Sequence, residues 1–328
     1  MTNLSRGYQG QKGVALISIL LVVAIATVLA TSLTADQHLV IQRARTFFDQ
    51  EQVRQYALGG EELARQILRE DFEADPQRDH LAEAWAAPEM IFEFEEGEVQ
   101  LEIEDLQGRL NINQLAGENQ LARARFATLF RQLGIDAGFL ARIEDWIDED
   151  QSTRQLGAED YDYLGLDRPY RTGQTMIVDI SELRLLLDMD PETWERLAPY
   201  VTALPDPSLP ININTAPSPV MQAVASGLSP EVAEALVMDR DQRQGYESVD
   251  QFLQLPELAG QGISQEGLGV QSAFFRVGVT ARYGDRIAYL TSIIQRSRTD
   301  GSMRVIYRNA GKKILPRVEE SEEEPGSG

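Results

Sequence analysis

The densest group of charged side chains in the sequence is an acidic segment, residues 143–165, in which Arg154 is the only base. Like charges at this density repel one another unless a cation binds among them, and Ca²⁺ is a hard cation that takes about six to eight oxygen ligands. With Asp148 at the first position of an EF-hand loop, Asp150 is third and Glu159 twelfth, but Thr153 stands where the sixth position requires glycine. The spacing argues against a true EF-hand and leaves two interpretations, a looser calcium loop or a solvated acidic face.

The composition removes most other kinds of chemistry. The 328 residues include no cysteine and two histidines, His38 and His80, which excludes thiolate catalysis, cysteine-based zinc fingers and multi-histidine metal sites. Paired carboxylates could act as the acid and base of a glycoside hydrolase, but acidic pairs are common and Trp146 alone is a poor sugar platform. The net charge of −22 argues against a nucleic-acid partner, since phosphate contacts depend on Lys and Arg. We therefore expect neither an enzyme nor a nucleic-acid-binding protein.

The N-terminus carries an apolar segment of membrane length. Residues 13–35 hold no formal charge, and a helix needs about 20 apolar residues to cross a bilayer. The charges ahead of this segment are basic, which keeps the N-terminus in the cytoplasm and sends the remainder across the membrane. Three interpretations are open: a signal peptide cut after Ala30, a permanent anchor, or a prepilin cut between Gly13 and Val14, whose junction resembles that of pilins and pseudopilins.

The apolar pattern continues beyond this segment. Over residues 39–68, apolar side chains recur at steps of three, four and seven, with charged residues on the other faces. This predicts one helix from about Val14 to Phe72, with its first half in lipid, its second half packed on a soluble domain, and a bend at Gly59-Gly60. A plain anchor would not need the second stripe, so the pattern favours the pilin-like interpretation.

The rest of the chain changes from a strand period to a helix period and back. Residues 90–106 alternate apolar and acidic side chains, as expected of a β-hairpin, and the two-residue period returns from Ala273. Between them the spacing is helical. A helical domain inserted into one sheet explains this order better than three separate domains, because a lone hairpin is marginally stable. The tail, residues 313–328, ends in the acidic segment VEESEEEPGSG, which offers little apolar surface to bury, and the tail is predicted to be disordered.

Two near-repeats, residues 109–113 and 210–216, lie in the helical region. Each places asparagine ahead of a helix, where the side chain can cap free N–H groups. The segment after the second repeat resembles helix-hairpin-helix or SAM-like units, which grip phosphates in other proteins. Here residues 229–257 carry Arg240 and Arg243 among many acids, so a packing role or a protein contact is favoured.

Six segments, in order along nearly the whole chain, resemble the general secretion pathway protein K family of type II secretion systems, which are minor pseudopilins. They are GVALISILLVVAIATVL, YALGGEELA, GRLNIN, DWIDED with GAEDYDYL, ISELRLL and LPININTA. The resemblance implies an α+β pseudopilin fold, a long N-terminal helix packed on an antiparallel sheet, with a large all-helical insertion that is SAM-like or helix-hairpin-helix-like. The chain then divides into a prepilin leader (1–13), the N-terminal helix (14–72), the sheet (73–108 and 270–312), the inserted domain (109–269) and the tail (313–328).

The resemblance also implies a function. Such a protein is cut by prepilin peptidase between Gly13 and Val14 and spans the bacterial inner membrane once, with its C-terminal domain in the periplasm. It assembles with minor pseudopilins I and J at the pseudopilus tip, to initiate or cap the pseudopilus during export of folded proteins. The alternative is a membrane-anchored periplasmic binding module built from the helix-hairpin-helix-like units.

Site residues follow from the same resemblance. Asp148, Asp150, Glu159 and Asp160 fall in the calcium-binding loop of the family, which implies Ca²⁺ as a bound ion. Pilins carry a glutamate at the fifth residue of the mature chain. The protein K family lacks this glutamate, and this chain has Ser18 at the position. A subunit without that carboxylate cannot neutralise the buried amine of a subunit ahead of it, which suits a position at the tip.

Overall fold

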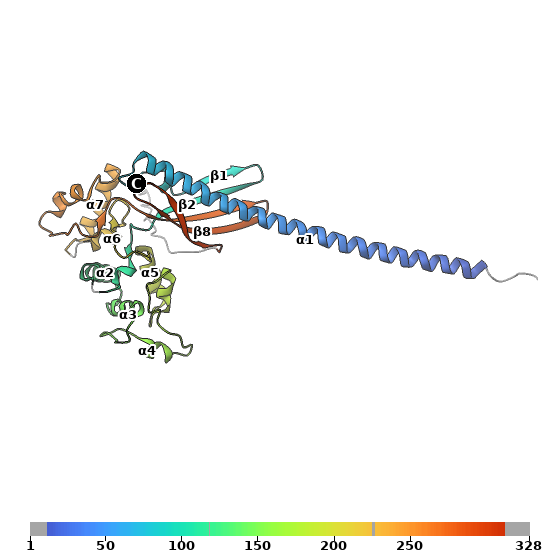
Figure 1. The fold of residues 1–328 in the computed structure, drawn as a ribbon, viewed down its shortest axis with the longest axis horizontal. Helices are drawn as coiled ribbons and strands as arrows, with labels where there is room; N and C mark the ends of the chain where they lie inside the picture. Colours follow the sequence, from blue (N-terminus) through green and yellow to red (C-terminus); the bar gives the residue numbers. More distant parts are fainter. Residues whose placement is uncertain (1–11, 118, 225–226, 312–328) are drawn as a thin grey trace, which may run out of the picture.

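The computed structural model describes residues 12–117, 119–224 and 227–311 of the chain. The predicted acidic tail, and all but the last two residues of the predicted leader, lie outside the described residues. The dominant element is α1 (Lys12–Ala74), a helix of 63 residues. Its first half projects away from the molecule, and its second half lies along a β-sheet (Figure 1).

The second half of α1 is held on the sheet by an apolar stripe. Val53, Ala57, Ala64 and Leu68 are buried against side chains of the sheet. The helix continues without interruption through Gly59 and Gly60, the position of the predicted bend. Gly60 instead lies where the helix closely approaches the sheet, because a Cβ there would lie 2.6 Å from a methyl of Val279.

The sheet has five antiparallel strands in the order β1-β2-β7-β8-β9. The bounds are β1 (Met90–Phe94), β2 (Gly97–Asp105), β7 (Phe274–Tyr283), β8 (Arg286–Arg296) and β9 (Met303–Asn309). Strands β2 and β7 pair from Gly97 with Tyr283 to Asp105 with Phe275, so the sheet joins two parts of the chain that are far apart in sequence. The predicted fold class, a long N-terminal helix on an antiparallel sheet with a helical insertion, is confirmed.

The chain between β2 and β7 forms the insertion, which lies at one end of the sheet (Figure 1). It has a hydrophobic core of its own, separate from the core between α1 and the sheet. Its helices are α2 (Gln120–Gln132), α3 (Gly138–Ile147), α4 (Asp160–Leu164), α5 (Pro191–Leu197), α6 (Ser218–Ala223), α7 (Pro230–Arg243) and α8 (Val249–Leu253). Short 3-10 turns lie at Ala84–Ala86 before the sheet, and at Ile112–Leu115, Ile180–Leu185, Ala198–Tyr200 and Pro256–Leu258 within the insertion.

The insertion is not all-helical as predicted, because it also contains two short parallel bridges, one at each near-repeat. The first joins β3 (Leu110–Asn111) to β4 (Val201–Thr202), and the second joins β5 (Ile211–Asn212) to β6 (Leu268–Gly269). The same arrangement at both repeats indicates that the insertion is built from two similar units.

The asparagines of the repeats do more than the predicted capping. Asn111 does cap the following 3-10 turn, through the N–H of Asn113. The side-chain amide of Asn113 pairs with both the N–H and the C=O of Ile177, at 2.8 and 2.9 Å. That of Asn214 pairs in the same way with Tyr246, at 2.7 and 3.0 Å. Because these buried amides replace missing backbone partners, they fix chain crossings that helix periodicity does not specify.

Candidate functional site

The first functional feature is the free half of α1. Among the described residues, α1 is the one helix long and apolar enough to cross a membrane. Its apolar side chains lie open to the surroundings, from Leu16 at 60% exposed to Leu33 at 61%. Gly13 and Val14, the predicted processing residues, lie in the first turn of this helix, and Ser18 follows on its exposed part. Such a surface is stable in a bilayer or in a bundle with other apolar helices.

The second feature is a cluster of three carboxylates at the far end of the insertion. Asp145, Asp148 and Glu159 each offer an oxygen, and these oxygens lie within 4.8 Å of one another. Asp145 and Asp148 share one face at the end of α3, three residues apart, and Glu159 precedes α4. We call this group the acidic triad.

Two members of the triad are buried, and its oxygens are only partly satisfied by hydrogen bonds. Asp145 is fully buried and Glu159 is 2% exposed. Both carboxylate oxygens of Glu159 and Oδ1 of Asp148 are buried without a hydrogen-bond partner. Burial, reinforced by Asp145 and Asp148, raises the pKa of Glu159 to about 7. Buried oxygens that lack donors are the arrangement a hard cation would complete, so the residues present fit a calcium ion.

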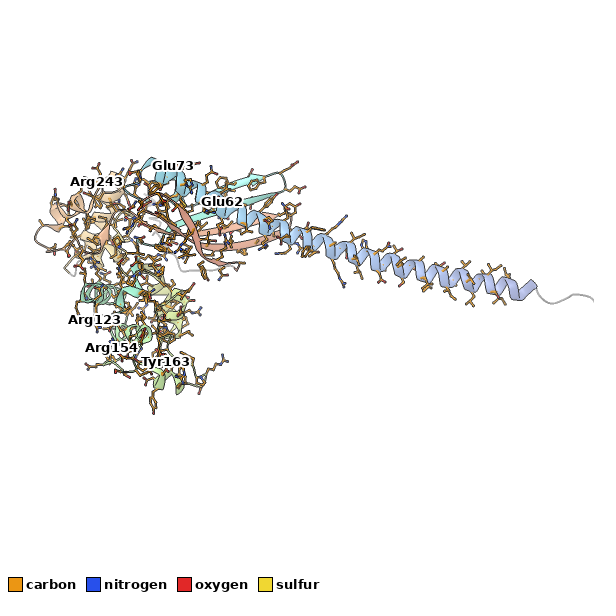
Figure 2. The ribbon with its side chains drawn as sticks, in the orientation of Figure 1. Glu62, Glu73, Arg123, Arg154, Tyr163 and Arg243 are labelled. Carbon is orange, nitrogen blue, oxygen red and sulfur yellow. The ribbon has the colours of Figure 1, made fainter. Side chains whose placement is uncertain are left out.

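The loop between α3 and α4 is shaped around the triad. The N–H of Gly157 donates to the carbonyl oxygen of Arg154 at 2.9 Å, and Leu156 adopts a left-handed backbone conformation with φ of 70°. A Cβ at Gly157 would lie 1.9 Å from Oδ2 of Asp145, so this position requires glycine. Arg154, labelled on the insertion in Figure 2, reaches back to the triad. Its guanidinium pairs with Asp145 and Asp148.

The four predicted metal ligands do not all meet. Asp148 and Glu159 lie in the triad. Asp150 lies on the exposed loop, where its Oδ1 accepts the N–H of Ser152 at 2.7 Å. Asp160 turns away and accepts hydrogen bonds from the N–H and hydroxyl of Thr172 and from Arg171.

Asp145 belongs to the triad but is not among the four predicted ligands. Its spacing from Asp148, one helical turn, was the available signal. An EF-hand loop that begins at Asp148 does not include the preceding helix, on which Asp145 lies.

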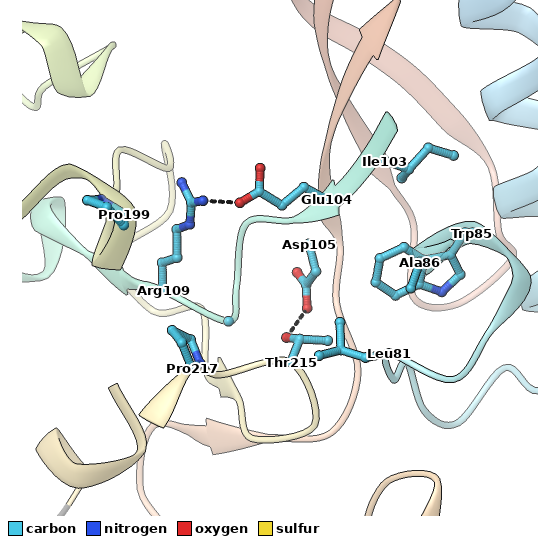
Figure 3. A pocket seen from close by; sticks show the side chains of 11 residues that line it. Leu81, Trp85, Ala86, Ile103, Glu104, Asp105, Arg109, Pro199, Thr215 and Pro217 are labelled. Carbon is cyan, nitrogen blue, oxygen red and sulfur yellow. Dashed lines mark hydrogen bonds and ion pairs between the residues drawn. The ribbon is translucent and has the colours of Figure 1, made fainter. Parts of the chain in front are cut away.

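A third feature, a pocket of about 190 Å³, lies where the insertion leaves the sheet (Figure 3). Glu104 pairs with Arg109 and also with Arg276. Asp105 is buried and accepts hydrogen bonds from Thr215, at 2.5 Å, and from Ser272, at 2.6 Å. The polar groups of this pocket are therefore used to join the insertion to the sheet.

The helix-hairpin-helix-like segment also uses its bases internally. Arg240 is buried and donates to the carbonyl oxygen of Ala216 at 2.6 Å, and Arg243 pairs with Asp239. These contacts agree with a packing role for this segment.

These features together define a class: a pilin-type subunit with an exposed apolar helix at one end and a large inserted domain at the other. Comparison with known proteins gives the family. Two family models described as "Type II secretion system (T2SS), protein K" match residues 108–206 and 211–271.

Individual relatives match over most of the chain. A type II secretion system protein K of Pseudomonas aeruginosa is 38% identical over 94% of this chain and 95% of its own length. That of Klebsiella pneumoniae is 33% identical over 92% of this chain and 97% of its own length. A chain in the crystal structure of the GspK-GspI-GspJ complex from enterotoxigenic Escherichia coli is 26% identical and aligns with a TM-score of 0.73, over 83% of this chain and all of that one. This chain belongs to the type II secretion system protein K family, and it is a minor pseudopilin.

Proposed function

We propose that this minor pseudopilin occupies the tip of the pseudopilus, together with minor pseudopilins I and J, and that it initiates or caps the fibre that exports folded proteins. The observation that carries the proposal is the position of the insertion. The membrane-directed end of the sheet lies by Tyr56, whose ring packs on Tyr283. The insertion leaves the opposite end, between Asp105 and Phe274 (Figure 1). A subunit stacked further along the axis of α1 would collide with it.

Two other observations support the tip position. Ser18 replaces the glutamate that, in pilins, neutralises the amine of a subunit ahead, and a tip subunit has no subunit ahead. The related GspK chain was solved in a complex with GspI and GspJ, which supports the same two kinds of partner here.

Labelling tests the tip position directly. Because the sequence has no cysteine, the variant Tyr161→Cys provides one labelling site, on a side chain that is 88% exposed at the far end of the insertion. We expect maleimide-gold on assembled pseudopili at one end of each fibre. Gold distributed along the fibre would reject the tip position, and the unmodified chain controls for adventitious labelling.

The anchoring proposal is that prepilin peptidase cuts between Gly13 and Val14, and that the mature chain spans the inner membrane with its insertion in the periplasm. The exposed apolar half of α1 supports this. We expect intact-mass analysis of the protein from membranes to place the N-terminus at Val14. A chain that begins after Ala30 would show that the whole segment is a signal peptide.

We also propose that the acidic triad binds Ca²⁺. When bound, the ion would coordinate the buried oxygens of Glu159 and Asp148 that lack hydrogen-bond partners. We expect calorimetric titration of the detergent-solubilised full chain to give calcium affinities at least about tenfold weaker for Asp148→Asn and Glu159→Gln than for the wild type. The matched control is Asp150→Asn, an exposed acid outside the triad. Equal weakening by the control would mean that general negative charge, and not the triad, attracts calcium.

The alternative, a periplasmic module that binds nucleic acid through its helix-hairpin-helix-like units, predicts retention on DNA that weakens with salt. The internal pairing of Arg240 and Arg243 favours the pseudopilin proposal.

A further inference from the structure

The acidic triad already holds a cation supplied by the chain. Nη1 of Arg154 donates to Oδ1 of Asp145 at 2.6 Å and also to Oδ2 of Asp148. The backbone N–H of Arg154 donates to the other oxygen of Asp145 at 3.2 Å. The guanidinium therefore occupies the side of the triad formed by the two aspartates and leaves Glu159 without a donor.

The oxygens divide between those held by Arg154 and those that are open. Both oxygens of Asp145 and one of Asp148 accept hydrogen bonds from Arg154. The remaining oxygen of Asp148 and both oxygens of Glu159 are buried and unpartnered. A divalent ion that takes an oxygen from each of the three carboxylates must take one of Asp145, either Oδ1, which the guanidinium of Arg154 bonds, or Oδ2, which its backbone N–H bonds. It would also face the like charge of the guanidinium, which stays protonated at any accessible pH.

Arg154 can leave the triad without disturbing the core. Its side chain is 39% exposed and comes from the surface loop between α3 and α4. The nearby acid Glu144 does not depend on it, because Arg123 bonds both oxygens of that carboxylate. The neighbouring Leu156 is 65% exposed, and the chain enters the core of the insertion only at Ala158.

We propose that Arg154 is a tethered competitor for calcium: it neutralises the triad when calcium is absent, and calcium binding displaces its guanidinium into solvent. This inference rests on the calcium proposal and adds to it a built-in exchange of cations. The exchange sets the calcium concentration at which the triad fills, and it presents a free basic side chain near α4, at the end of the insertion furthest from the sheet (Figures 1 and 2).

The first experiment compares calcium affinities by titration calorimetry of the full chain in detergent. We expect Arg154→Gln to bind calcium about tenfold more tightly than the wild type. A factor of ten corresponds to about 1.4 kcal/mol, which is less than one hydrogen bond to a charged group contributes. The matched control is Arg171→Gln, which removes the same charge nearby from a pair with Asp160, outside the triad. Its affinity should stay within about twofold of the wild type.

The second experiment uses the wild type alone and so does not depend on the folding of a variant. An arginine-selective dicarbonyl reagent, read out by peptide mass spectrometry, should modify Arg154 faster when calcium is added. Arg171, whose side chain is 72% exposed, should react at the same rate in both conditions.

The outcomes separate the two proposals. If calcium binds the wild type, but Arg154→Gln is unchanged or weaker and modification of Arg154 does not rise, the competitor role is overturned and the calcium site stands. Equal gains in both arginine variants would also overturn it, as an effect of general charge. If neither the wild type nor Arg154→Gln binds calcium, the calcium site itself is wrong and the exchange fails with it.

Discussion

Glu83 retains a proton near neutral pH because of where the loop after α1 places it. Its Oε2 accepts the backbone N–H of His80 at 3.0 Å and the indole N–H of Trp85 at 2.6 Å. The carboxyl group of Glu83 also hydrogen-bonds to the side chain of Asp71. Burial, with the adjacent charge of Asp71, raises the pKa of Glu83 to about 8. A carboxylic acid that donates to a neighbouring carboxylate is the simplest account of this contact.

This protonation predicts a pH-dependent stability. A carboxyl whose pKa is raised in the folded state binds a proton that the unfolded chain releases, so its contribution to stability is lost as pH rises from about 4.5 to about 8. Glu83→Gln keeps an oxygen for His80 and Trp85 and an N–H for Asp71. We expect urea denaturation to find it more stable than the wild type by about 1–3 kcal/mol at pH 8, with a smaller gain at pH 5.

The control for this prediction is Glu93→Gln, an exposed carboxyl on β1. It should change the free energy of unfolding little at either pH. A gain for Glu83→Gln that is the same at pH 5 and pH 8 would mean that Glu83 does not carry the proton.

At the scale of the element, α1 has two halves that meet different surroundings. The exposed half needs an apolar surface on all sides, while the half on the sheet needs only one apolar face. Glu61 on the packed half is buried, and Arg308 of β9 bonds both of its oxygens, at 2.8 and 2.6 Å. This pair fixes the rotation of α1 on the sheet, because a turn of the helix would leave a buried charge unpaired.

The two glycines of α1 provide a matched test of the packing. A Cβ at Gly60 would meet Val279 and Val99 at 2.6 and 2.8 Å, whereas one at Gly59 would meet nothing within 4 Å. We expect Gly60→Ala to destabilise the fold by about 1–3 kcal/mol through overpacking. Gly59→Ala should stabilise it by up to about 1 kcal/mol through helix propensity. Thermal denaturation measures both, and equal effects would show that helix propensity alone decides.

The elements with a regular period could be predicted from the sequence. Alternation predicts the hairpin of β1 and β2 and the strand period that returns in β7 and β8, and the spacing of apolar residues predicts α1 close to its observed ends. These signals are local, because each side chain reports which face of its own element is buried.

The contacts that assemble the elements could not be predicted in this way. Asn113 bonds to Ile177, and Asn214 to Tyr246, but a single sequence does not mark which distant backbone a side chain will meet. For the same reason, the sequence predicts only two of the three members of the acidic triad. Asp148 and Glu159 have the spacing of a calcium-binding loop, whereas Asp145 comes from the end of the preceding helix. Asp160 lies outside the triad because its carboxylate accepts a hydrogen bond from the N–H of Thr172.

At the scale of the whole molecule, Arg296 at the end of β8 connects the sheet to the end of α1, to the loop that follows α1 and to the end of the insertion. Its buried guanidinium donates to the carbonyl oxygen of Leu68 and to Asp71 at the end of α1, and to Asp79 in the loop before the sheet. It also donates to the carbonyl oxygen of Ser272, where the insertion returns to the sheet. The insertion and the sheet have separate main cores and meet at a small apolar cluster of Leu106, Leu204, Leu209, Ala273 and Phe274. Polar contacts such as those of Arg296 add to this cluster in holding the two together.

Arg296→Ala tests this junction. The variant leaves Asp71 and Asp79 buried and facing each other, which should cost about 3–5 kcal/mol at pH 7. Burial raises the pKa of Asp71 to about 6 and raises that of Asp79, so at pH 5 both carboxyls take up protons more readily and the loss should be smaller. The control, Arg304→Ala, removes an exposed arginine of β9 that bonds to Gln295, and should be nearly neutral.

Hydrogen exchange would show where Arg296→Ala acts. We expect faster exchange in residues 75–80, 105–108 and 268–275, which meet at the junction, while amides inside the insertion stay protected by its own core. That pattern would mean that the insertion remains folded but is held less firmly on the sheet. Uniform acceleration throughout the insertion would show instead that the insertion and the sheet form one cooperative unit, and that Arg296 supports the whole fold and not the junction alone.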